Sequence, residues 1–195
     1  MFKKLYNWVI HWSKSAHALF ALFLVAFSES SFFPVPPDVL LIAIVLNQHK
    51  KWFKAAGICL LGSVLGGICG YFIGKAVWDI VSPFFFRYIF SEAIFTSVRE
   101  LYKRYEFWAV FTAGFTPIPY KVFTIAGGVC RINFFVFVIA SVLSRGARFF
   151  MVAILLRIFG AKVKTFIEKY FNIITIIFVI ALFGGFFIIK YIIKH

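Results

Sequence analysis

Ionisable side chains set in apolar sequence are the first candidates for chemistry in this chain. Five of them lie within or beside long hydrophobic runs: Glu29, Asp38, Lys121, Arg145 and Arg148. Arginines three residues apart share one face of a helix, so Arg145 and Arg148 could bind a phosphate group bidentately. A carboxylate in the same surroundings could exchange a proton during transport. The residue types therefore indicate an anion site beside proton-exchanging carboxylates.

These charges have structural explanations that compete with a functional one. A charge at the centre of a bilayer costs about 3 kcal/mol on insertion scales, so each needs a reason to be there. Ion pairs that lock helices together are one reason, and snorkelling of long side chains to the interface is another. For Lys121 and Arg148 these structural explanations weigh nearly as much as a functional one. Glu29 and Asp38 lie beside a proline break, which favours a functional role.

The composition indicates that lipid surrounds these residues. Of the 195 residues, 63% are hydrophobic and 14% are charged, against an apolar share of about 45–50% in soluble domains. A soluble domain of this size could not hide so much apolar surface. The formal net charge of +14 falls mostly in clusters between the apolar runs. Membrane proteins contact anionic lipid headgroups in this way, so we expect lipids and not nucleic acid as partners.

Cysteine and histidine give no sign of a metal or redox site. The three cysteines, Cys59, Cys69 and Cys130, lie inside apolar stretches without paired spacing. The four histidines show no ligand spacing either. We therefore expect no disulfide framework, no metal and no cofactor. The scarcity of histidine and acidic residues also leaves little material for catalysis, so we expect that the protein is not an enzyme.

Two proline-broken apolar segments must position the five charges. The prolines at the breaks are Pro34, Pro36 and Pro37 in the first segment, and Pro117 and Pro119 in the second. Proline stops a helix and fixes the turn that follows, so each segment reads as two short arms of a re-entrant hairpin. Residues 34–43 and 117–126 align without gaps and agree at six positions. The alignment pairs Asp38 with Lys121.

The repeat predicts an all-α integral membrane fold. A re-entrant hairpin followed by one spanning helix crosses the bilayer once, so a second copy must start on the opposite side, which gives an inverted repeat. We expect a single membrane domain, 1–195. It comprises a first repeat at 28–80, interfacial amphipathic helices at 82–106, a second repeat at 107–157 and a C-terminal transmembrane helix at 170–190.

A glycine series in the first spanning segment predicts close helix packing. Glycines recur at every fourth residue, at Gly62, Gly66, Gly70 and Gly74. This spacing places all of them on one helix face. Small residues in such a stripe allow another backbone to approach closely in lipid.

Taken together, the motifs resemble a known family. They are Glu29 with Pro34-x-Pro36-Pro37-Asp38, the glycine series with Gly70-Tyr71-x-x-Gly74, and the stretch from Phe115-x-Pro117 to Ala126-Gly127-Gly128. In combination they are similar to the DedA family, also called the VTT domain or SNARE-associated Golgi protein group. The resemblance covers roughly residues 28–150, which is most of the chain.

The resemblance implies a multi-pass protein of the bacterial or archaeal cytoplasmic membrane with two facing re-entrant hairpins. It implies transport of lipids, such as undecaprenyl phosphate or phospholipids, and would place the essential acidic pair on Glu29 and Asp38. The family pattern also has two arginines flanking the second proline. Those positions are Gly114 and Tyr120 here, with Lys121 next to the latter, which places the chain in a divergent branch. Arg145 and Arg148 are candidates to supply the positive charge instead.

Three functional classes follow from these features. The favoured class is a flippase or scramblase for a phosphate-bearing lipid, with proton coupling as an option. The same architecture allows a proton- or ion-coupled transporter of a small solute. The third class is a membrane enzyme acting on lipid phosphate, for which the sequence shows no nucleophile or metal motif. The oligomeric state stays open, a homodimer included.

Overall fold

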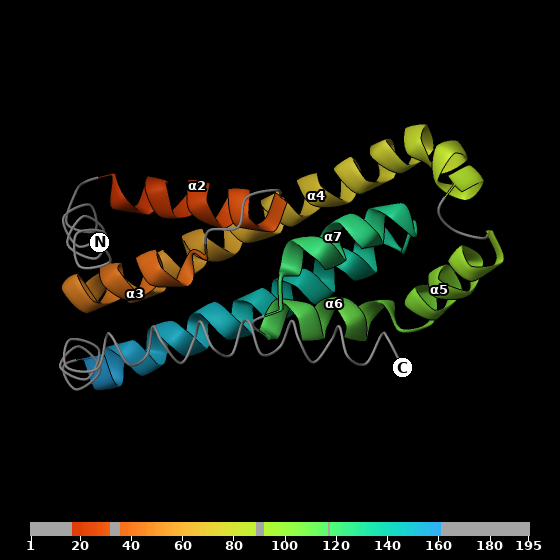
Figure 1. Cartoon of the computed structure of the whole chain (residues 1–195). Helices are drawn as coiled ribbons and strands as arrows, with labels where there is room; N and C mark the ends of the chain where they lie inside the picture. Colours follow the sequence, from red (N-terminus) through yellow and green to blue (C-terminus); the bar gives the residue numbers. More distant parts are fainter. Residues whose placement is uncertain (1–16, 32–35, 89–91, 117, 161–195) are drawn as a thin grey trace, which may run out of the picture. The chain divides into compact units, whose positions relative to one another are not determined.

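The computed structural model describes residues 17–31, 36–88, 92–116 and 118–160. The secondary structure within these ranges is helical, without a strand (Figure 1). The chain divides into two units, Met1–Arg157 and Ile158–His195, and the contacts given below lie within the first. The C-terminal transmembrane helix expected at 170–190, and the residues Pro34 and Pro117, lie outside the described residues.

Two helices in the described ranges are long and apolar enough to cross a membrane. The first is His49–Phe84, which joins the short 3-10 helix η1 (His49–Lys51) to most of α4 (Trp52–Tyr88). The second is Phe134–Gly160. Both fall where the sequence predicts spanning segments. However, α4 continues through Pro83 to Tyr88, past the expected end near residue 80. Pro83 lies in the last two turns, where the lost backbone hydrogen bond has little helix left to interrupt.

The two proline-broken segments each form a pair of short helices. The first pair is α2 (Ala18–Ser31) and α3 (Asp38–Asn47), and the second is α6 (Glu106–Phe115) and α7 (Tyr120–Val129). At 1.5 Å per residue their lengths are about 21 Å for α2 and 15 Å for the others, short of a hydrocarbon core of about 30 Å. Figure 1 shows α2 along the first part of α4 and α7 along its later part.

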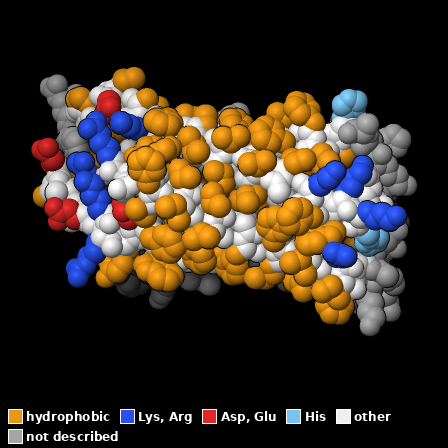
Figure 2. Space-filling view, turned by 180° about the vertical axis from the view of Figure 1, so that it is seen from behind, with side chains coloured by type: hydrophobic (Ala, Val, Ile, Leu, Met, Phe, Trp, Pro, Cys, Tyr) orange, Lys and Arg blue, Asp and Glu red, His pale blue; other side chains and the backbone are white. Residues whose placement is uncertain are grey.

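The apolar side chains that point outward match a lipid environment. Figure 2 shows hydrophobic side chains covering the middle of the visible face, with lysines and arginines gathered towards two ends. Large residues such as Ile80, Phe135 and Trp108 are exposed by 79%, 75% and 64%. Exposure on this scale is untypical of soluble monomers. It is what an apolar helix bundle presents to lipid.

The glycine series of α4 lies against both short-helix pairs. A Cβ atom added at Gly62 would lie 2.6 Å from the backbone oxygen of Phe23, and one at Gly66 would overlap the backbone of Phe27, both in α2. About two helical turns further along α4, a Cβ at Gly74 would overlap the backbone oxygen of Ile125 in α7. Each position therefore carries a direct backbone contact that only glycine allows.

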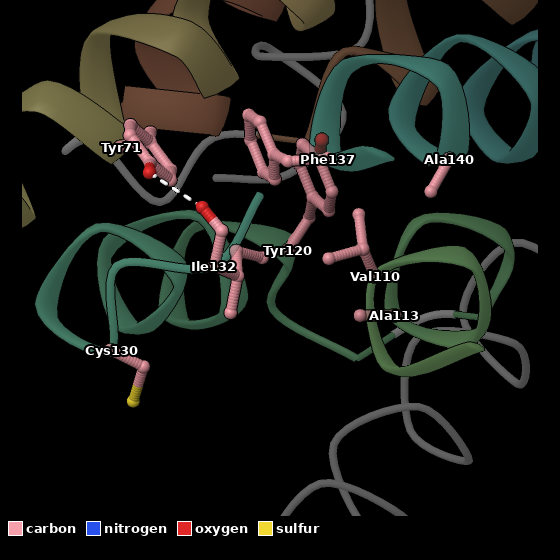
Figure 3. Packing of buried hydrophobic residues seen from close by; sticks show 8 residues of the cluster. All are labelled: Tyr71, Val110, Ala113, Tyr120, Cys130, Ile132, Phe137 and Ala140. Atoms are coloured by element: carbon pink, nitrogen blue, oxygen red, sulfur yellow. Dashed lines mark hydrogen bonds between the residues drawn. The ribbon is translucent and has the colours of Figure 1, made fainter. Parts of the chain in front are cut away.

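An aromatic core lies around α7, shown in Figure 3. It joins α4, α6, α7 and the helix Phe134–Gly160, and contains Tyr71, Val110, Ala113, Tyr120, Cys130, Ile132, Phe137 and Ala140. The Tyr71 hydroxyl donates to the Ile132 backbone oxygen at 2.8 Å, which satisfies its one polar group inside the cluster. The core thus fixes the second short-helix pair against α4.

The amphipathic helix α5 (Glu92–Arg104) connects the two halves. Glu92 lies in its first turn and Lys103 and Arg104 in its last, a distribution that complements the helix dipole. The Tyr102 hydroxyl donates to the Phe123 backbone oxygen at 2.9 Å. Burial raises the pKa of this hydroxyl, so it stays protonated and keeps donating.

Candidate functional site

A buried ion pair joins the first short-helix pair to the second long helix. The Arg145 Nη2 donates to Glu29 Oε2 at 2.6 Å, across 116 positions of sequence. The Arg145 side chain is 2% exposed and that of Glu29 is 17% exposed. Glu29 lies in the last turn of α2, and Arg145 lies midway along the helix Phe134–Gly160.

Two serines complete a ring of hydrogen bonds around this ion pair. The Arg145 Nε donates to Ser63 Oγ at 2.6 Å, and the Ser63 and Ser30 hydroxyls are 2.7 Å apart. The Ser30 hydroxyl donates to Glu29 Oε2 at 3.1 Å. Since Ser30 gives its only proton to Glu29, Ser63 must donate in the bond between the two hydroxyls, and the direction of every bond is set. The ring binds α2, α4 and Phe134–Gly160 into one polar unit.

Aromatic rings cover the Arg145 guanidinium. Its central carbon lies 4.9 Å from the Tyr120 ring centroid and 4.7 Å from the Phe149 ring centroid, within cation–π range. The Tyr120 hydroxyl bonds the Ser141 hydroxyl, so the ring is itself anchored. A Cβ added at Gly114 would lie 3.5 Å from Arg145 Cδ. Arg145 therefore contacts both positions, 114 and 120, at which the family pattern has arginines.

A second ion pair lies one helical turn away and is more open. Arg148 Nη2 donates to Asp38 Oδ2 at 2.7 Å, and its Nη1 donates to the Thr116 backbone oxygen at 2.7 Å. The Arg148 and Asp38 side chains are 21% and 20% exposed. Asp38 begins α3 immediately after Pro37, and Thr116 caps the C-terminal end of α6 immediately before residue 117. Arg148 thus contacts both broken segments at their breaks.

The other residues singled out from the sequence have less specific surroundings. Lys121 lies in the first turn of α7, half-buried, and forms no ion pair within the described ranges. Pro37 is fully buried, whereas Pro36 and Pro119 are exposed. Arg145 and Arg148 do share one helix, as their spacing predicts, but each reaches a different carboxylate instead of a common ligand.

Sequence reasoning missed the uncharged members of the site. Ser30, Ser63 and Tyr120 carry the hydrogen-bond ring and the aromatic cover, and Thr124 of α7 approaches the Ser30 backbone oxygen at 3.2 Å. A usable signal existed, because Ser30 follows Glu29 and Ser63 follows Gly62 directly in the chain. Hydroxyl groups buried in an apolar helix bundle need hydrogen-bond partners.

The charges of the site are balanced. Two carboxylates face two guanidinium groups, and in the described part of the chain every buried side-chain nitrogen and oxygen has a hydrogen-bond partner. No group of three or more histidine, cysteine, aspartate or glutamate side chains there is placed to hold a metal ion. What the arrangement offers chemically is guanidinium donors for an anion and carboxylates that compete for them.

The fold and this site define a helical membrane protein with two ion pairs beside a broken helical segment. Comparison with known proteins agrees with that class: the VTT domain matches residues 35–158. The chain belongs to the VTT-domain family, also called the DedA family. Members of this family are membrane-associated and are generally regarded as transporter-like.

Relatives occur in both bacteria and archaea. An uncharacterized protein of Haemophilus influenzae is 38% identical over 190 residues, covering 97% of this chain and 98% of the relative. One from Histophilus somni is 35% identical over 172 residues, covering 86% and 90%. One from Methanocaldococcus jannaschii is 30% identical over 139 residues, covering 70% and 82%. No solved structure matches the chain.

Proposed function

We propose that this chain is a lipid flippase or scramblase of the cytoplasmic membrane. Its substrate in this proposal is a phosphate-bearing lipid, such as undecaprenyl phosphate or a phospholipid. The observation that carries the proposal is the two arginine–carboxylate ion pairs, whose carboxylates lie on either side of the first helix break inside an otherwise apolar helix bundle. Ionisable groups are retained at such depth mainly along substrate or proton pathways.

The proposal assigns the two short-helix pairs to re-entrant hairpins. Each of their helices is too short to span alone, and each pair is broken at prolines. Backbone groups freed at such breaks are tolerated only inside protein or along a wet cavity. Two hairpins entering from opposite sides would place that polar region near the midplane, as in transporters built from inverted repeats.

The proposed substrate class rests on the N–H donors of the arginine guanidinium groups. A guanidinium group presents a planar set of N–H donors that matches phosphate oxygens. The carboxylates Glu29 and Asp38 give a route for proton coupling, because a carboxylate in such surroundings can take up and release a proton. The divergence at positions 114 and 120 fits the same proposal, since the Arg145 side chain lies beside position 114 and its guanidinium lies over the Tyr120 ring.

Leaflet exchange in reconstituted vesicles tests the proposal. The purified full chain is placed in liposomes that carry labelled undecaprenyl phosphate or phosphatidylethanolamine, and wild type is compared with Asp38→Asn and Arg145→Ala. We expect exchange above that of empty vesicles and a loss of about tenfold or more in both variants, because a charge-assisted hydrogen bond contributes about 1.5–3 kcal/mol. Asp79→Asn is the matched control, since the Asp79–Arg131 ion pair is about half exposed.

Each alternative has its own outcome in this assay. If neither lipid moves faster than in empty vesicles, the lipid proposal is wrong and a coupled transporter of a small solute replaces it. Appearance of a dephosphorylated lipid would instead identify a membrane enzyme acting on lipid phosphate. If Asp79→Asn slows exchange as much as Asp38→Asn, the site assignment fails even though lipid moves.

A further inference from the structure

We infer that the two ion pairs have different tasks: Arg148 binds the substrate phosphate in exchange for Asp38, whereas Arg145 stays bound to Glu29 as a positioning residue. The inference rests on the proposed function and names the phosphate subsite within it. Two arginines on one face of a helix look equivalent in sequence, but their surroundings in the structure differ.

Arg145 is almost closed to a ligand. Its Nε and Nη2 donate to Ser63 and Glu29, its guanidinium carbon lies 4.9 Å and 4.7 Å from two aromatic ring centroids, and its side chain is 2% exposed. Moving it would break the ring of hydrogen bonds and leave Glu29 without its charge partner. Breaking a buried ion pair in this way is strongly destabilising, which holds Arg145 in place.

Arg148 has the opposite character. Its contacts are with one carboxylate and one backbone oxygen, and both members of its ion pair are about one-fifth exposed. Its hydrogen bonds use Nη1 and Nη2, and no aromatic ring of the described residues lies over its guanidinium, so Nε can still donate to a ligand. A phosphate oxygen can replace the Asp38 carboxylate on Nη2 without a change in the number of charge-assisted hydrogen bonds at Arg148.

Exchange at this position would also change how the helices are linked. Arg148 connects Phe134–Gly160 to α3 through Asp38 and to α6 through the Thr116 backbone oxygen. When phosphate takes the place of Asp38, the first link is lost and the second remains. Binding of the anion therefore frees the start of α3 while α6 stays attached, which couples substrate binding to release of α3.

Equilibrium binding to the full chain in detergent micelles tests the assignment. Calorimetric titration uses dihexanoyl phosphatidic acid, inorganic phosphate and, as a phosphate-free control, dihexanoylglycerol. The variants are Arg148→Lys, Asp38→Asn and Arg145→Lys, with Arg131→Lys as a matched control at an exposed ion pair. Thermal unfolding of each variant checks that it is folded.

The expected results differ in sign between the variants. Arg148→Lys weakens phosphatidic acid binding about tenfold or more, because lysine lacks the planar set of donors. Asp38→Asn strengthens binding severalfold, because the competing carboxylate is gone. Arg145→Lys lowers the Tm more than Arg148→Lys does and changes the Kd less, because it disturbs the buried ring of hydrogen bonds and not the phosphate contact. Preference for phosphatidic acid over inorganic phosphate identifies a lipid headgroup as the source of the phosphate, and equal binding identifies the free anion.

Several outcomes would overturn the inference. They are a wild type that binds neither phosphate probe, an Arg148→Lys variant with the Kd of Arg131→Lys, and an Asp38→Asn variant that binds more weakly than wild type. Failure here is distinguishable from failure of the proposed function. Lipid exchange without Arg148-dependent binding refutes only the subsite, and Arg148-dependent binding without lipid exchange refutes only the transport of lipid.

Discussion

The Glu29–Arg145 ion pair shows at the scale of single residues what a buried charge requires. Both charges are largely removed from solvent, and the pair is accompanied by two serines and two aromatic rings. Loss of one partner leaves the other charge buried alone, which costs about 3–5 kcal/mol, whereas loss of both is much less harmful. This asymmetry gives a measurable signature.

A double-mutant cycle on the free energy of unfolding measures that signature. We expect Arg145→Met and Glu29→Gln each to destabilise the protein, and the double variant to lose much less than the sum of the two. The Asp79–Arg131 pair is the control, because about half of each of its side chains is exposed. Exposed ion pairs couple by only about 0–1 kcal/mol. Denaturation of the full chain in detergent gives both coupling energies, and additive effects at Glu29 and Arg145 would contradict the expectation.

The sequence identified the charged residues of the site but not their partners. Apolar surroundings single out Glu29 and Arg145, because each ionisable group interrupts a hydrophobic run. Nothing in their local sequence joins them, since they are 116 positions apart. Helical periodicity assigns a residue to a face, and the partner across the interface depends on how whole helices pack. For the same reason, the different environments of Arg145 and Arg148 emerge only from the fold.

At the scale of elements, α4 is the helix against which both short-helix pairs lie. Its glycine face contacts α2 at Gly62 and Gly66 and contacts α7 at Gly74. Close approach of the backbones brings Ser63, between these glycines in the chain, to the ion pair. The spacing of the glycines predicts a face for close packing. It does not predict that this face contacts two different helices, because spacing alone does not give the number of neighbours.

Alanine substitutions along α4 test these contacts. Gly66→Ala and Gly74→Ala should each destabilise the protein by about 1–3 kcal/mol, because the added methyl group meets backbone that cannot rotate away. Gly57→Ala is the matched control on the same helix, since a Cβ there would meet no atom within 4 Å. Alanine also favours helix over glycine, so the control should be neutral or stabilising. Thermal unfolding in detergent distinguishes the three, and equal Tm values would refute the close contacts.

At the scale of the whole molecule, the face shown in Figure 2 has an apolar middle and charged ends, which suits a bilayer. The topology depends on whether the two helix breaks lie inside that bilayer. In the proposed arrangement, Lys51 in η1, just before α4, and Glu100 in α5 lie on opposite sides of the membrane. Ile118, at the second break, lies near the midplane although its side chain is 45% exposed. If α6 instead crossed the whole bilayer, Ile118 would reach the side of Lys51.

Cysteine labelling with a membrane-impermeant maleimide separates these two topologies. The native cysteines, Cys59, Cys69 and Cys130, are first replaced by alanine, and single cysteines are then introduced as Lys51→Cys, Glu100→Cys and Ile118→Cys. In vesicles of defined orientation, we expect the first two to react from opposite sides, because one spanning helix separates them. Ile118→Cys should react slowly from both sides, because a hairpin tip in the membrane is remote from either aqueous phase. Fast reaction of Ile118→Cys from the side of Lys51→Cys would show that α6 spans, and the inverted hairpin would then be wrong.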